Sequence, residues 1–235
     1  MENAEQRAAD AQVKRQEMLD FLNADAQTYR FLSQMFFKEL NDEAIDALAA
    51  EEWPEDTGNA HLDRGYELLR RYFAFSGSDR RGQLAVEYAR VFLAAGVFTR
   101  EARTAVPYES VFTSEDRGMM GDARDDVAAH FAEDGFLVNP ELHEPEDHVA
   151  FELEYLSVMS ERAAKLLEEG ERDAFARNVQ RQIEFIEKHL LNWIGALHDA
   201  AKEYAKTTFY TGMLQVAWGA LEQSLDMLRE CSARC

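Results

Sequence analysis

The sequence predicts an all-α fold, a helical bundle of about 8–10 helices, from three observations. Apolar residues recur at every third or fourth position along most of the chain, which is the period of one helical face. Alternating β-branched stretches bounded by turn residues are nearly absent, and only residues 108–113 are weakly extended in character. The prolines lie where the periodicity breaks, so the proline-free ranges 1–53 and 146–235 have room for long helices.

Each expected helix is marked by its own apolar stripe. Two of the later helices carry a second apolar row, at Phe151 and Tyr155 and again at Phe185 and Leu191. A helix that is apolar around most of its circumference belongs in the middle of a bundle, so these helices are expected to be central. In chain order the stripes run over residues 22–36, 66–73, 84–95, 149–167, 183–197 and 210–228.

A glycine- and acid-rich span, residues 118–143, separates two helical halves. It predicts an N-terminal helical part, residues 1–143, of roughly five helices, and a C-terminal helical part, residues 144–235, built as a three-helix unit. The length of the chain suits one large domain. We therefore expect the two parts to form one compact unit.

The charge is strongly negative and unevenly distributed. Acidic residues number 45 against 25 basic ones, which gives a net charge of −20. Nucleic acids and anionic membranes attract lysine and arginine, so neither is an expected partner, and a basic partner is the natural complement. Residues 109–154 hold 14 acids opposed by only Arg117 and Arg124, a balance of −12. That segment is either a solvated face or a surface for a basic partner.

The sequence carries no sign of export or membrane insertion. No apolar run reaches the ~18 residues of a membrane span. The first residues lack the basic start and apolar core of a signal peptide. We therefore expect a cytoplasmic protein without stable membrane insertion. The two cysteines, Cys231 and Cys235, are too few for a disulfide framework and are expected to be an incidental tail.

Residues 144–154 combine several carboxylates with an imidazole at the start of an expected helix. In one interpretation Glu144 caps the helix, Pro145 takes its first position, and the acids of the first turn complement the positive helix end. That interpretation leaves His148 unexplained, because a cation is disfavoured at a helix start. In another interpretation Glu144, His148 and Glu152 share a face and bind a metal, as in a ferritin-like protein.

Enzyme chemistry has little support in the sequence. The Glu-x-x-His pairs of di-iron bundles and the His-Glu-x-x-His spacing of zinc proteases are both missing. Ser110 and Ser157 lack the glycines of a nucleophile elbow, and no phosphate-binding loop of the Gly-x-x-x-x-Gly-Lys type occurs. The sequence therefore predicts a protein that is not an enzyme and has no cofactor, with the metal site as the alternative.

Two pairs of aromatic residues differ in their surroundings. Tyr88 and Phe92 lie at helical spacing, which is typical of a core. Tyr108 and Phe112 follow Pro107 in an expected loop, where burial alone explains them less well. Loop aromatics beside carboxylates can form an apolar groove with an acidic rim. Such a groove suits a peptide that has a basic end and an apolar stretch.

Four blocks of sequence follow one another in a characteristic order. Together they resemble the TorD/DmsD/NarJ family of molybdoenzyme maturation chaperones, and the resemblance covers about residues 20–228. The blocks are Tyr88-x-Arg90-Val91-Phe92, Pro107-Tyr108-Glu109-Ser110-Val111-Phe112, Glu144-x-x-Asp147-His148-x-x-x-Glu152-Leu153-Glu154-Tyr155-Leu156, and His189-Leu190-x-x-Trp193 followed by Phe209-Tyr210.

The resemblance implies a cytoplasmic, non-catalytic chaperone with a hinge before the Asp-His block. Its partner would be a molybdopterin-containing oxidoreductase catalytic subunit, whose twin-arginine signal peptide it would bind, holding back export until the cofactor is inserted. Members occur as monomers or as domain-swapped homodimers, and proposed roles of the hinge pair include weak guanine-nucleotide binding.

The resemblance also implies which residues bind the peptide. The aromatic and aliphatic residues would line or support the groove, the hinge pair would lie beside it, and the acids would meet the two arginines. These residues are Tyr88, Val91, Phe92, Tyr108 and Ser110 for the groove, Asp147 and His148 for the hinge pair, and Glu109, Glu144 and Glu152 for the acids.

Overall fold

The computed structural model describes residues 2–93, 105–114 and 118–232, the side chains of residues 2–8 excepted. Within those ranges it contains helices and no strand, so the predicted all-α bundle is confirmed. The elements are α1 (Glu2–Phe37), α2 (Asp42–Ala50), α3 (Ala60–Phe75), α4 (Arg80–Val91), α5 (Glu109–Thr113), α6 (Asp122–Glu133), the 3₁₀ turn η1 (Pro140–Leu142), α7 (Val149–Glu169), α8 (Arg172–Phe185), the π-helical turn η2 (Ile186–Leu190), α9 (Ile194–Tyr204) and α10 (Phe209–Ser232).

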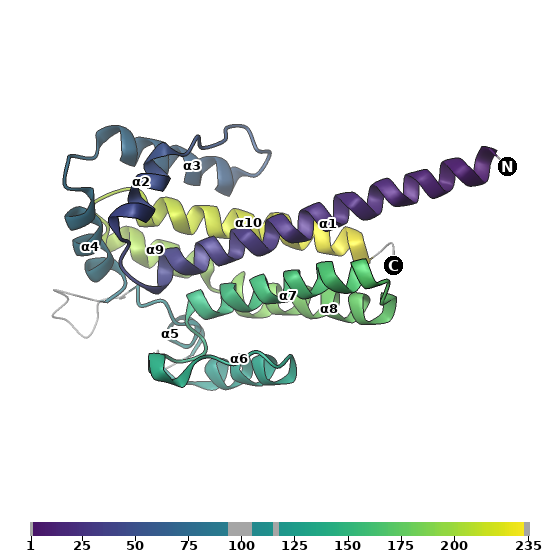
Figure 1. Ribbon diagram of the computed structural model, residues 1–235. Coiled ribbons are helices and arrows are strands. Elements are labelled where there is room, and N and C mark those ends of the chain that lie inside the picture. Colours follow the sequence, from purple (N-terminus) through teal and green to yellow (C-terminus); the bar gives the residue numbers. More distant parts are fainter. Residues whose placement is uncertain (1, 94–104, 115–117, 233–235) are drawn as a thin grey trace.

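The long helices pack side by side, and their pairing crosses the middle of the sequence. α1 lies mainly along α7, and α3 lies along α10. Figure 1 shows the first turns of α1 extending beyond the bundle. In the same view α6 lies at the lower edge of the bundle. Each of these pairs joins a helix of residues 1–143 to a helix of residues 144–235. The two predicted parts therefore share one hydrophobic core.

The predicted stripes form that core. The stripe of α1, from Leu22 to Phe36, is buried, as is the stripe of α10 from Tyr210 to Leu228. Phe151, Tyr155 and Phe185 of the second rows are buried too, because α7 and α8 contact neighbours on more than one side. Ala95, at the end of the third stripe, lies outside the described residues.

One local prediction is wrong, and one helix was not recognised from the sequence. Within the span 118–143, residues 122–133 form α6, which buries Val127 and Phe131. The segment predicted as weakly extended is extended only at Tyr108, which forms an isolated bridge with His148, and continues as the short helix α5. Both segments are too short or too acidic for their apolar period to be recognised from sequence.

None of the described helices contains a stretch that is both long enough and apolar enough to cross a lipid bilayer. This result concerns the described part of the chain only.

Glycines allow α3 and α10 to approach closely. A Cβ atom at Gly65 would lie 2.8 Å from the backbone nitrogen of Val216 and 2.9 Å from the carbonyl oxygen of Gly212. A Cβ atom at Gly219 would lie 2.7 Å from the backbone nitrogen of Leu62. These distances are too short for a side chain, so backbone packs on backbone here and the helices are held in one register.

We expect Gly65→Ala to lower the free energy of unfolding by about 1–3 kcal/mol, because the added methyl group forces α3 away from α10. In a solvent-exposed helix the same change is stabilising by ~0.5–1 kcal/mol, so the sign of the effect is diagnostic. Urea unfolding followed by circular dichroism measures it. Gly77→Ala is the control, because its Cβ would meet only the end of the Gln83 side chain at 3.4 Å. An unchanged midpoint for Gly65→Ala would contradict the close approach.

Candidate functional site

The second and third sequence blocks meet in space through a short antiparallel bridge. The Val149 amide donates to the Pro107 carbonyl, and the Glu109 amide donates to the Asp147 carbonyl, both at 2.9 Å. Tyr108 and His148 are the paired residues. Two segments about forty residues apart in sequence are thereby fixed to each other at the start of α7.

His148 is the N-cap of α7, and its Nδ1 accepts a hydrogen bond from the Ala150 amide at 3.1 Å. The helix therefore begins at Val149, and the predicted cap at Glu144 with Pro145 in the first position is wrong. His148 is buried, and this burial lowers its pKa to about 4. A neutral imidazole offers a lone pair and carries no charge against the helix dipole, which removes the objection to a histidine at this position.

Asp147 caps the neighbouring helix, α5. Its Oδ2 accepts a hydrogen bond from the Ser110 amide at 2.9 Å, in the first turn of α5. Asp147 and Ser110 are both completely buried. Adjacent residues of the predicted hinge pair thus cap two different helices, and each helix start depends on the other segment.

Glu144 lies outside this buried cluster. It is exposed and accepts a hydrogen bond from the Tyr108 hydroxyl. The neighbouring Glu146 pairs with Arg124 at 2.6 Å. Because the helix starts after Glu144, the spacing of Glu144, His148 and Glu152 does not put them on one helical face. Among the described residues these three side chains form no group able to hold a metal ion.

Glu109 and Glu152 bring two further carboxyl groups into the interior. Glu109 contacts Nδ1 of His189 at 2.9 Å and accepts a hydrogen bond from Nδ2 of Asn192 at 3.1 Å. Glu152 is fully buried, and its pKa is raised well above the ordinary value by desolvation first and then by the negative charges of Glu109 and Asp147. Burial beside other carboxylates therefore favours the protonated form of Glu152.

A π-helical turn positions the partners of Glu109. In η2 the Leu191 amide donates to the Ile186 carbonyl at 2.9 Å, a spacing of five residues where an α-helix has four. His189 of this turn and Asn192, which follows it, both contact Glu109, and Trp193 stacks on Phe112 with ring centroids 5.5 Å apart. The fourth sequence block thus packs against the second.

Tyr88, Val91 and Phe92 lie in the core beside the end of α1. The Tyr88 hydroxyl donates to the Phe36 carbonyl at 3.1 Å, and the ring of Phe92 meets that of Phe36 edge-on at 6.0 Å. All three predicted residues are at most 4% exposed. In this conformation they hold the last turn of α1 in place and do not line an open surface. Their part in peptide binding stays a prediction.

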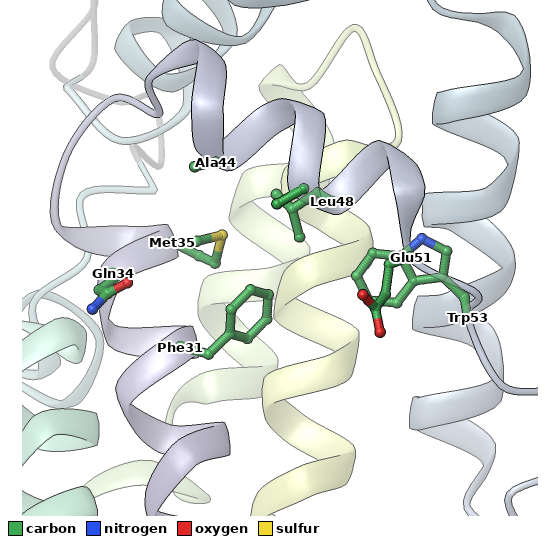
Figure 2. A pocket seen from close by; sticks show the side chains of 8 residues that line it. Phe31, Gln34, Met35, Ala44, Leu48, Glu51 and Trp53 are labelled. Atoms are coloured by element: carbon green, nitrogen blue, oxygen red, sulfur yellow. The ribbon is translucent and has the colours of Figure 1, made fainter.

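A groove that the sequence did not reveal opens beside them, between α1, α2 and α7. Two adjoining hollows of ≈470 and ≈600 Å³ share Gln34, Met35 and Ala44. Figure 2 shows Phe31 and Met35 of α1 facing Leu48 of α2 across the first hollow. The second hollow continues to α7. Its remaining lining residues include Phe37, Glu39, Phe151 and Glu154, and those of the first include Glu51 and Trp53.

The groove borders the predicted hinge pair. The ring of His148 lies 6.2 Å from that of Phe37 and 5.6 Å from that of Phe151, and both phenylalanines line the groove. The floor is apolar, and carboxylates of Glu39, Glu51 and Glu154 lie along it. These hollows are lined by residues other than those from which the sequence predicted a peptide groove, and that predicted groove stays a prediction.

Many acids of residues 109–154 have basic partners inside the molecule. Arg181 of α8 pairs with Asp134 at 2.6 Å and with Glu133 at 2.8 Å. Lys188 pairs with Asp126, and Arg30 lies 3.9 Å from Glu154. The balance of −12 along the sequence is therefore partly neutralised in space, because the long helices bring in distant arginines and lysines.

Comparison with known proteins agrees with the earlier resemblance. The model of the nitrate reductase delta subunit family matches residues 59–199, which is more than half of the chain and includes Tyr88, Glu109, Asp147, His148 and His189. The chain belongs to the nitrate reductase delta subunit family. The matched range contains every sequence-predicted site residue.

Similar proteins include several that are named chaperone protein TorD. That of Vibrio cholerae serotype O1 is 27% identical over 218 residues, covering 87% of this chain and 92% of the relative. Those of Vibrio vulnificus and Photobacterium profundum are each 27% identical, over 214 and 210 residues. Each of these two alignments covers 86% of this chain, and they cover 93% and 92% of the relatives.

The groove residues of this delta-subunit family member escaped sequence reasoning for identifiable reasons. Phe31 and Phe37 lie off the main stripe of α1 and look like ordinary surface aromatics. Trp53 was the clearest available signal, because a large aromatic directly before Pro54 in a connecting segment is not explained by helical periodicity. It stacks on Tyr66 of α3 with centroids 5.7 Å apart.

We expect the stability contributed by His148 to fall as the pH is lowered from about 6.5 to about 4, by about 3 kcal/mol in total. The folded pKa lies below the unfolded one, so in this window the unfolded chain binds a proton that the folded chain excludes. His148→Asn keeps a capping group without titrating. As the pH falls, the unfolding free energy of wild type should therefore decrease relative to that of His148→Asn, as measured by urea unfolding. His143→Asn, at an exposed histidine, is the control, and a pH-independent difference for His148→Asn would contradict the buried neutral cap.

Glu152→Gln should stabilise this family member at pH 7 and above. The folded pKa of Glu152 is raised, so above about pH 4.5 the unfolded chain releases a proton that the folded chain retains, and stability falls as pH rises. Glutamine keeps the shape and cannot ionise. Its advantage over wild type should grow by up to about 1.4 kcal/mol per pH unit until the folded pKa is reached. Glu154→Gln, at a partly exposed neighbour, is the control, and an equal slope in both variants would contradict the role of the buried Glu152.

Proposed function

We propose that this protein is a cytoplasmic chaperone for a molybdopterin-containing oxidoreductase catalytic subunit. It binds the twin-arginine signal peptide, the apo form of that subunit, or both, assists cofactor insertion and delays export. The observation that carries the proposal is the groove between α1, α2 and α7, which has an apolar floor and carboxylates along it. Family membership and relatives named as chaperones support it, and they also support the prediction that the chain is not an enzyme.

The groove matches the two parts of such a peptide. A twin-arginine signal peptide presents two arginines followed by an apolar run. The apolar run would lie on Phe31, Met35 and Leu48, and the arginines would meet carboxylates at Glu39 and Glu154. A desolvated arginine–carboxylate contact contributes about 1.5–3 kcal/mol, and one at an exposed rim contributes under about 1 kcal/mol. The apolar floor supplies the remainder of the affinity.

The sequence-predicted residues take part in this proposal mainly as supports. Tyr88 and Phe92 hold the last turn of α1, which forms one wall of the groove. His148 packs against Phe37 and Phe151 at its α7 end. The exposed pair of Tyr108 and Glu144 adds a carboxylate near the hinge pair. A hinge before Asp147, through which protomers could exchange helices in a domain-swapped homodimer, stays part of the proposal.

The test is isothermal titration of the protein with a synthetic twin-arginine signal peptide of a molybdoenzyme from the same organism. We expect micromolar or tighter binding that Gln34→Trp weakens at least about tenfold, because the new ring fills the groove. Gln223→Trp is the matched control, since Gln223 is an exposed glutamine on α10 and does not line either hollow.

The salt dependence of binding distinguishes the arginine–carboxylate contacts from the apolar contacts. Raising the salt concentration to about 0.5 M should weaken the interaction several-fold by screening the arginine contacts, while the apolar contribution persists. Equal affinity of Gln34→Trp and Gln223→Trp for the peptide would exclude this groove. Absence of binding to any candidate signal peptide by the wild-type protein would exclude the signal-peptide part of the proposal.

A further inference from the structure

One cluster of metal-binding side chains lies outside the proposed groove, between α6 and the π-helical turn. Asp126 and His130 are four residues apart on α6, and His189 comes from η2. One ligand atom of each lies within 4.8 Å of the others. We propose that these three residues form a binding site for a divalent transition-metal ion of the zinc type, a function that goes beyond the proposed chaperone activity.

The hydrogen bonds of both histidines prepare their Nε2 atoms as ligands. Nδ1 of His189 contacts the Glu109 carboxylate at 2.9 Å, and Nδ1 of His130 contacts the Asp126 carbonyl at 3.2 Å. A carboxylate or carbonyl acceptor keeps the proton on Nδ1 and leaves the lone pair on Nε2. This carboxylate–histidine arrangement is the one that orients metal-ligating histidines and raises their basicity.

His189 supplies the observation that points to a ligand. Its side chain is 1% exposed, and Nε2 has no hydrogen-bond partner among the described residues. That atom lies 3.5 Å from Oδ2 of Asp126. Two ligands held at about 2.1 Å from a tetrahedral zinc ion lie about 3.4 Å apart, so this pair already has the required separation. A ring nitrogen of the partly exposed His130 lies within 4.8 Å of the other two ligand atoms and completes the set.

Lys188 is the competing cation. Its ammonium group pairs with Asp126 Oδ2, the same oxygen that faces His189. Lys188 is 57% exposed and has a flexible side chain, so a divalent ion can displace it into solvent. Two imidazoles and one carboxylate leave at least one position of a tetrahedral ion open. Bound metal would fasten α6 to η2, and through Glu109 to the buried carboxyl cluster.

The experiment is titration of untagged, chelator-treated protein with Zn²⁺, using calorimetry for affinity and thermal unfolding for stabilisation. We expect one ion per chain and a rise in unfolding temperature that EDTA reverses. Asp126→Asn and His130→Gln should each weaken binding by at least about tenfold. Lys188→Gln should tighten binding, because it removes the competing charge and no ligand.

Two controls assign the site. His143→Asn changes an exposed histidine elsewhere and should bind zinc like wild type. The double variant Cys231→Ser/Cys235→Ser should also retain binding. Loss of zinc in the cysteine variant, wild-type affinity in both Asp126→Asn and His130→Gln, or no binding by the wild-type protein would each overturn the proposal. None of these outcomes depends on peptide binding, so the zinc site and the chaperone proposal can fail separately.

Discussion

The antiparallel bridge between Tyr108 and His148 is the contact on which the rest of the site depends. Two backbone hydrogen bonds at 2.9 Å join residues 107–109 to the start of α7. The side chain of Asp147 then caps α5, and that of His148 caps α7. Because the two helix starts share one short stretch of backbone, neither can shift without exposing amide groups of the other. The buried carboxyl groups of Glu109 and Asp147 are fixed by the same bridge.

The interior behind this bridge tolerates several ionisable groups because most of them are neutral or paired. His148 is neutral at physiological pH as a result of burial, and burial beside other carboxylates raises the pKa of Glu152 and favours its protonated form. Glu109 is held between His189 and Asn192. Burying a carboxylate without a partner would cost several kcal/mol, so these arrangements are the condition for placing an acidic cluster at the centre of a helical bundle. They also make the start of α7 sensitive to pH, because the pKa values of His148 and Glu152 differ from their ordinary values.

The packing of the helices changes which charges are neighbours. Arginine and lysine side chains of α8 and η2 pair with acids of residues 109–154 that have few basic residues near them in the sequence. Glu39, Glu51 and Glu154 line the two hollows around α1, α2 and α7, and of these Glu154 also lies 3.9 Å from Arg30. The proposal of a partner with a basic end and an apolar stretch rests on this groove.

The sequence by itself determined the fold class and the core, because apolar residues that recur every three or four positions fit a helix with one buried face. Leu22 to Phe36 and Tyr210 to Leu228 were recognisable for that reason. It also identified Tyr108 and His148 as unusual, since local rules did not account for them, and the family resemblance singled out Asp147 beside His148. Tertiary structure alone decided what they do. The proton on His148, the pairing of Glu109 with a histidine eighty residues away, and the groove around Met35 depend on neighbours that no sequence spacing encodes. Desolvation and long-range contact exist only after the helices have packed.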